Sequence, residues 1–197
     1  MKRPLIIIAV IALILFMIYR LFAGTYNKMV TFDEQVSNAW SQVENVYQRR
    51  LDLIPNLVAT VKGAADFEQT TLTKVIEARA SATQVRVDPK NLTPEALQKF
   101  QEAQGQLSSA LGRLMVVAEQ YPNLKANQNF LDLQSQLEGT ENRITVERQK
   151  FNDVAQGFNT YIRSFPQNLL AGMFGFTRKA YFESDKGASK PPEVDFK

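Results

Sequence analysis

The chain has 197 residues, enough for a membrane anchor and one modest domain, and it contains neither cysteine nor histidine. This composition excludes disulfides, thiol nucleophiles, Cys/His metal sites and Ser-His-Asp triads. The net charge of +3 is accounted for by Lys2, Arg3 and Arg20, which lie in or beside an N-terminal apolar segment. The rest of the chain is balanced in charge, so no nucleic-acid partner is expected.

The N-terminal segment has the length and composition of a membrane span. Residues 5–19 read LIIIAVIALILFMIY without interruption, and an apolar stretch continues beyond Arg20. A helix over residues 4–23 would rise about 30 Å, which matches the hydrocarbon core of a bilayer. Because the run is long and residues 23–25 make a poor cleavage site, an uncleaved single-pass anchor within residues 1–25 is favoured over a cleaved signal peptide. The anchor residues are Leu5, Ile8, Ile11, Leu15, Tyr19 and Arg20.

Positive charge flanks both ends of this anchor. Lys2, Arg3 and the amino terminus precede it, whereas Arg20 and Lys28 follow it. The positive-inside tendency favours, by a narrow margin, a cytoplasmic N-terminus and a following domain on the other side of the membrane.

The remaining periodicity is helical, and no stretch alternates with a period of two. One row of apolar residues recurs every seven positions, as in the seam of a coiled coil. Similar stripes predict four helices, at about residues 26–51, 53–84, 94–121 and 126–164, in an all-α, antiparallel up-and-down four-helix bundle over residues 26–165. The alternative is one long kinked helix from the membrane to residue 84 in a three-helix arrangement. The clearest row is Phe130, Leu137, Ile144, Phe151, Phe158 and Phe165.

Prolines and a cap mark the expected helix ends. Thr93 followed by Pro94 predicts an N-cap and a first-turn proline, and Pro122 is expected to end the helix before it. In RRLDLIPNLVATVKG, residues 49–63, Pro55 cannot donate to the carbonyl of Leu51. We therefore predict a packed corner here, between the first and second bundle helices, rather than a ligand loop.

The charged side chains near the apolar stripes are expected to form ion pairs. Glu68 and Glu147 would suit a carboxylate metal site, but ferritin-like sites also use histidine, which is absent. Arg49 and Arg50 would suit an anion site at a helix N-terminus, although pairing with Glu44, Asp52 or a neighbouring helix end is favoured. No catalytic, cofactor-binding or metal-binding residue is therefore predicted. The other expected pairings join Glu147 to Arg113 or Arg143, and Glu68 to Arg79 or Lys74.

Small residues share one face of the third predicted helix. Gly105 and Gly112 are seven residues apart, with Ser108 between them. Each glycine costs about 1 kcal/mol of helix propensity relative to alanine. This face is either a contact surface for another helix or another copy, or a place of close packing inside the bundle.

Residues 166–182 are apolar but rich in glycine. In an up-and-down bundle the last helix returns toward the membrane, so this segment is expected either to contact the bilayer or to close the bundle as a lid. Residues 183–197 are polar and contain two adjacent prolines, which predicts a disordered tail. The residues expected at the membrane are Leu169, Leu170, Met173, Phe174 and Phe176.

Three stretches carry a resemblance to a known family. They are YNKMVTFDEQVSNAWSQVENVYQRRLDLIPNLVATVKG, the later run ALGRLMVVAEQYPNLKANQNFLDLQSQLEGTENRITVERQKFNDVAQGFNTYIRSFP, and the ending GFTRKAYFES followed by PPEVDF. Together they resemble the LemA family over essentially the whole chain. The resemblance implies a bacterial, membrane-anchored helical bundle and supplies no enzymatic activity. With it, we expect the anchor in the bacterial inner (cytoplasmic) membrane and the bundle on the periplasmic or extracellular side.

Three functions follow in order of preference. The first is a non-enzymatic, membrane-tethered interaction scaffold in the bacterial envelope, with membrane lipid and an unidentified membrane or envelope protein as partners. The second is a self-associating protein that organises or remodels membrane as a homo-oligomer. An enzyme is last, because no nucleophile–base pair or metal constellation is evident.

Overall fold

The structure is a computed structural model that describes residues 2–63 and 68–183. These residues contain helices and connecting segments but no strand, as expected for an all-α chain. The predicted tail, residues 183–197, lies outside the described residues except for Glu183. The helices are α1 (Lys2–Lys62), α2 (Gln69–Gln84), α3 (Pro94–Ala118), α4 (Pro122–Lys125), α5 (Gln128–Arg163) and α6 (Gln167–Met173).

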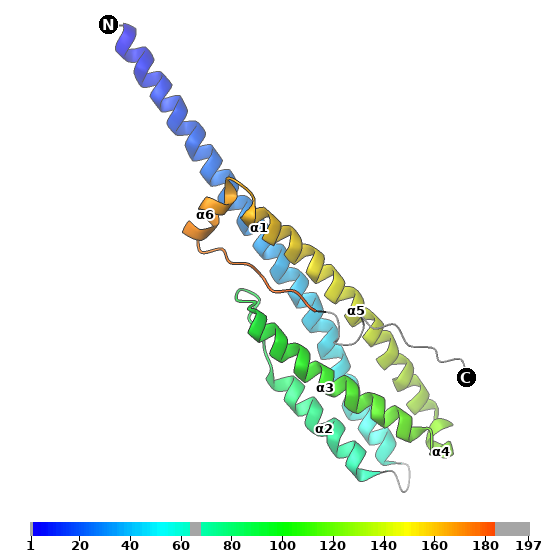
Figure 1. The fold of residues 1–197 in the computed structure, drawn as a ribbon. Helices are drawn as coiled ribbons and strands as arrows, with labels where there is room; N and C mark the ends of the chain where they lie inside the picture. The colour runs from blue at the N-terminus through cyan, green and yellow to red at the C-terminus, as the bar shows by residue number, and fades with distance from the viewer. Residues whose placement is uncertain (1, 64–67, 184–197) are drawn as a thin grey trace, which may run out of the picture.

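The apolar segment and the first helix of the bundle form one continuous helix. α1 runs for 61 residues, and its N-terminal part extends alone beyond every other helix (Figure 1). The apolar side chains from Leu5 to Phe22 are exposed. α1 has the length and hydropathy to cross a membrane, and none of its most apolar stretch is buried within the fold. Large exposed apolar surfaces are typical of segments that contact a membrane, so α1 combines a candidate membrane span with a bundle helix.

The bundle is built from two packed pairs of helices. α5 runs back along α1. α2 and α3 pack together beside the distal half of that pair, which is the half farther from the N-terminal apolar segment (Figure 1). The distal core joins apolar residues of α1, α2, α3, α4 and α5. The proximal core instead joins α1 and α5 to the start of α3, to α6 and to the segment after it. Its centre is Trp40, which is fully buried.

Four helices of similar length are not observed. α1 alone has 61 residues, α5 has 36, α3 has 25 and α2 has only 16, and two short helices, α4 and α6, follow α3 and α5. α1 is unbroken between residues 25 and 26, where the anchor was expected to pass into the bundle.

The predicted corner at residues 49–63 is wrong. α1 continues through Pro55 to Lys62, and the turn to α2 comes only after it. Pro55 removes the helical donor for the carbonyl of Leu51, but Arg79 of α2 donates to that carbonyl instead. Because this lost hydrogen bond is replaced, the helix does not have to end. The alternative of a single helix continuing to residue 84 is also wrong, because α2 is a separate helix.

The predicted N-cap of α3 is confirmed. The Thr93 hydroxyl accepts a hydrogen bond from the backbone N–H of Ala96 at 3.2 Å, and Pro94 opens the helix. Asn127 caps α5 in the same way, through the N–H of Phe130 at 3.3 Å. These caps satisfy donors that have no partner within the helix.

Candidate functional site

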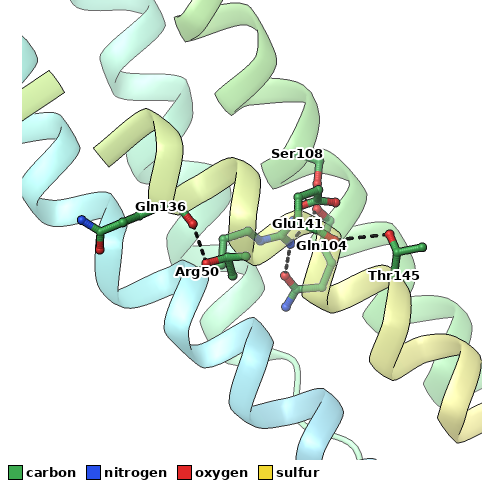
Figure 2. A network of polar contacts seen from close by, with 7 residues as sticks. Arg50, Gln104, Ser108, Gln136, Glu141 and Thr145 are labelled. Atoms are coloured by element: carbon green, nitrogen blue, oxygen red, sulfur yellow. Dashed lines mark hydrogen bonds and ion pairs between the residues drawn. The ribbon is translucent and has the colours of Figure 1, made fainter. Parts of the chain in front are cut away.

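A buried arginine joins three helices in the middle of the bundle. Arg50 of α1 is 2% exposed, and its Nη1 donates to Ser108 of α3 and to Glu141 of α5, both at 2.8 Å. Its Nη2 donates to the side-chain oxygen of Gln104 at 2.6 Å (Figure 2). Among the described residues, the Nε of Arg50 has no hydrogen-bond acceptor. Arg50 also packs over the ring of Tyr47, 5.1 Å from its centroid.

A polar crevice opens beside this arginine. Its volume is about 270 Å³, and a second guanidinium, that of Arg148, lies on its wall with the side chains of α3. Its lining contains neither cysteine nor histidine, and Ser108 and Glu141 each accept a hydrogen bond from Arg50. The arrangement joins α1, α3 and α5 by charge-assisted hydrogen bonds. The lining residues are Tyr47, Arg50, Gln101, Gln104, Gly105, Ser108, Ser109, Glu141 and Arg148.

The segment after α6 is held along α5 by two asparagines. The side chain of Asn159 accepts from the N–H of Lys179 at 2.9 Å and donates to its carbonyl at 2.8 Å. Asn152 makes the same two bonds with Phe182, at 2.8 and 2.9 Å. Asn152 and Asn159 are seven residues apart on a helix, a rise of about 10 Å. Lys179 and Phe182 are three residues apart in an extended segment, which is about the same length, so the two pairs can lie opposite each other.

Two side chains of this segment are anchored in the proximal core. Lys179 is 5% exposed, and its ammonium pairs with Asp33 at 2.8 Å and donates to the carbonyl of Lys90 at 3.0 Å. Phe182 is buried and stacks on Trp40, with ring centroids 5.9 Å apart. Residues 176–183 therefore complete the core between α1, α3 and α5.

We call the contacts of Asn152 and Asn159 with the segment after α6 the asparagine clamp. It was not predicted from the sequence. Asn152 and Asn159 show the required spacing of seven, but nothing in the sequence shows which segment they meet. The prediction of a lid came nearest, since the segment after α6 covers the proximal core.

The residues expected at the membrane divide between the inside and the outside of the fold. Leu170 is buried and Phe176 is half-buried in the proximal core, whereas Leu169, Met173 and Phe174 are exposed. Contact with lipid stays a prediction.

The face formed by Gly105, Ser108 and Gly112 is open. Both glycines are exposed, and a methyl group added at either would meet no atom within 4 Å. Close packing inside the bundle is therefore not the reason for them. Ser108 accepts the hydrogen bond from Arg50. Contact of this face with another helix or another copy stays a prediction.

The partners predicted for Glu147, Glu68 and Arg50 are wrong. Glu147 pairs with Lys150 at 2.7 Å, and Glu68 accepts from the hydroxyl of Thr71 at 3.0 Å. Arg50 pairs across the bundle with Glu141, so it lies in the bundle interior rather than at the N-terminus of a second helix. Across residues 2–63 and 68–183, no group of three or more His, Cys, Asp or Glu side chains is placed to hold a metal ion.

Comparison with known sequences agrees with the resemblance. The pattern that defines the LemA family matches residues 39–196. The magnetosome protein MamQ 2 of Paramagnetospirillum magneticum is 28% identical over 206 residues, covering 96% of this chain and 75% of the relative. The MamQ protein of Magnetospirillum gryphiswaldense is 28% identical over 183 residues, covering 84% and 67%. The protein LemA of Metamycoplasma hominis is 25% identical over 168 residues, covering 85% and 73%. The chain belongs to the LemA family.

Proposed function

We propose that this protein is a non-catalytic scaffold of the bacterial envelope, anchored in the inner membrane with its bundle on the periplasmic or extracellular side. The observation that carries the proposal is the continuity of α1 from its exposed apolar part into the bundle. Because no flexible linker intervenes, the bundle is held at a fixed orientation to the anchor. The part of α1 from Gly24 to Lys62 reaches about 60 Å at 1.5 Å per residue.

The chemistry of the bundle supports binding rather than catalysis. The polar groups around Arg50 are occupied by partners from within the fold. A protein of this kind acts by presenting helix faces to partners at a set distance from the membrane. The Metamycoplasma relative bears the family name LemA, and two others are named as magnetosome proteins. None of these is an enzyme name.

A photo-crosslinking amino acid placed on the bundle tests the scaffold. It is introduced at Ser109 on α3 or at Asn142 on α5, both exposed, in cells expressing the full chain at its native level. The expected result is one reproducible heterologous neighbour at one of these faces, and no such product from a chain carrying the same amino acid at Ile11 in the anchor. Crosslinks only between copies, or only to lipid, would overturn the scaffold.

The orientation has its own test, because the chain lacks cysteine. A cysteine at Ser109 should react in intact, outer-membrane-permeabilised cells with a maleimide that cannot cross the inner membrane. A cysteine that reacts only after the inner membrane is opened would place the bundle in the cytoplasm instead.

A second candidate is a self-associating protein that organises membrane. The observation in its favour is the open glycine-bearing face of α3, where two glycines lower the helix propensity although a methyl group at either would meet no atom within 4 Å. Ser109 lies between Gly105 and Gly112 in the sequence. Crosslinks between copies at Ser109 would therefore favour this candidate over the scaffold.

A further inference from the structure

The short helix α6 exposes two large apolar side chains next to the polar Asn168. Leu169 and Met173, one helical turn apart, are 65% and 68% exposed, while Leu170 and Ala171 on the opposite side are buried. Phe165, just before α6, is 80% exposed. We call these three exposed residues, with the partly exposed Phe174, the α6 patch. Large side chains exposed together in this way mark a contact surface.

The α6 patch lies beside the end of the apolar part of α1. The ring of Phe174 packs against Tyr26 with centroids 4.9 Å apart. Tyr26 comes three residues after Ala23, the last residue of the apolar run, which is about 4.5 Å along the helix. Figure 1 shows α6 next to α1 where α1 leaves the other helices. The patch is therefore at the depth of the lipid headgroups when α1 spans the bilayer.

The charge around the α6 patch complements an anionic lipid surface. Residues 1–32 and 154–182 contain no aspartate or glutamate. The basic residues of these two stretches include Arg163 and Arg178, which line one hollow beside α6. Arg20 and Lys28 are exposed on α1. Apolar side chains bordered by basic ones are typical of segments that lie in the membrane interface.

We propose that the α6 patch is a second membrane contact, seated in the headgroup region of an anionic bilayer beside the anchor. This inference rests on the membrane anchoring in the proposed function and deepens it. α1 fixes the bundle to the anchor but leaves the tilt of the whole molecule relative to the membrane open. Contact at α6 restricts that tilt and determines which side of the bundle faces the membrane.

The test measures the depth of single positions in the bilayer. Met173, Ile11 and Val116 are each replaced by cysteine in the full chain and labelled with the fluorophore NBD. Val116 of α3 is the matched control, because it is 68% exposed, as Met173 is, but lies outside the proposed contact. The chains are placed in vesicles of phosphatidylethanolamine and phosphatidylglycerol that contain a lipid with a nitroxide high on its acyl chain.

NBD at Met173 should emit at a shorter wavelength and be quenched by the nitroxide lipid, whereas NBD at Val116 should show neither change. NBD at Ile11 reports the anchor separately. Quenching at Ile11 but not at Met173 would overturn the α6 contact and leave the anchor standing. A blue shift at Met173 without quenching would mean that protein covers the patch, which also overturns the proposal. Absence of quenching at Ile11 would instead overturn the anchoring itself.

A second variant tests whether these side chains make the contact. Leu169→Ser together with Met173→Ser is made in a chain labelled at Asn168→Cys, an exposed position on α6. Quenching at residue 168 should be lost, while the emission of the buried Trp40 stays unchanged because both substituted side chains point outward. Quenching that persists in this variant would contradict a contact made by the α6 patch.

Discussion

The Nε of Arg79 in α2 donates to the carbonyl oxygen of Leu51 in α1 at 3.0 Å. This is the carbonyl that Pro55, four residues later, leaves without its helical donor. The side chain of one helix thus replaces a main-chain hydrogen bond missing from another. α1 can carry a proline inside the bundle because α2 is packed where it is.

Arg79→Ala should therefore destabilise the fold, by about 1–2 kcal/mol, because it leaves a partly buried carbonyl unpaired. In a Pro55→Ala background the loss should be smaller, since an alanine at that position supplies the N–H that the carbonyl of Leu51 lacks. Urea unfolding of the full chain in detergent, followed by Trp40 fluorescence, gives both values. Trp40 is a suitable reporter because it is the chain's only tryptophan and is fully buried.

Lys74→Ala on the exposed side of α2 serves as the control and should change the free energy of unfolding little. An equal loss for Arg79→Ala with and without Pro55 would show that Arg79 acts independently of the proline, contrary to the geometry.

The clamp on Lys179 gives a second prediction. Asn159→Ala removes the two hydrogen bonds to the main chain of Lys179, a buried residue. This should lower the free energy of unfolding by about 2–4 kcal/mol. Asn152→Ala should cost less, because Asn152 is only half-buried and water can reach the atoms it leaves. The same unfolding measurement ranks them, with Asn38→Ala on the exposed side of α1 as control. Equal losses at positions 152 and 159 would contradict the dependence on burial.

The ion pair between Lys179 and Asp33 should respond unequally to the loss of each partner. Asp33→Asn leaves a buried ammonium without its counter-ion and should cost about 2–3 kcal/mol. Lys179→Met removes the charge but keeps most of the packed stem, so about 1 kcal/mol is expected. Unfolding of the two variants and of the double variant measures the coupling. A larger loss for Lys179→Met would show that packing or the bond to Lys90, and not the charge, dominates.

Much of the fold was predictable because local sequence patterns indicate helices and their ends. The row at intervals of seven correctly identified five buried residues of α5, from Phe130 to Phe158, but not Phe165, which is exposed. Thr140 is a polar residue of the same helix, yet it is buried, and its hydroxyl donates to the carbonyl of Gln136 at 2.7 Å. The cap at Thr93 was found for the same reason, since it depends on residues three apart.

The errors arise where distant residues decide the outcome. Pro55 predicts a helix end when only its neighbours are considered, but Arg79, which lies 28 residues from Leu51, removes that penalty by donating to the Leu51 carbonyl. Arg50 has acidic residues nearby in sequence, yet its carboxylate partner is 91 residues away on α5. The asparagine clamp also depends on a segment 20 to 30 residues later in the chain. Such contacts have no local signature, because they depend on how the helices pack.

The Arg50 network should tolerate loss of its carboxylate better than loss of its guanidinium. Glu141 is about half exposed, so Glu141→Gln should cost only about 0.5–1 kcal/mol. Arg50→Ala removes a buried side chain that reaches both α3 and α5, and about 2–4 kcal/mol is expected. Urea unfolding of both variants tests the order. A loss at Glu141→Gln as large as that at Arg50→Ala would mean that the ion pair alone holds the network.

The open glycines of α3 provide a prediction that separates folding from association. Because no atom lies within 4 Å of an added methyl group at Gly105 or Gly112, alanine at both should raise the free energy of unfolding by about 1 kcal/mol per site. If copies of the chain meet through this face, the same variant should lose crosslinks between copies, because close approach of helices needs small residues. Gly157→Ala on α5, also exposed and without neighbours, is the matched control: it should stabilise the fold and leave association unchanged. A gain in stability with association intact would mean that copies do not meet through the glycine-bearing face.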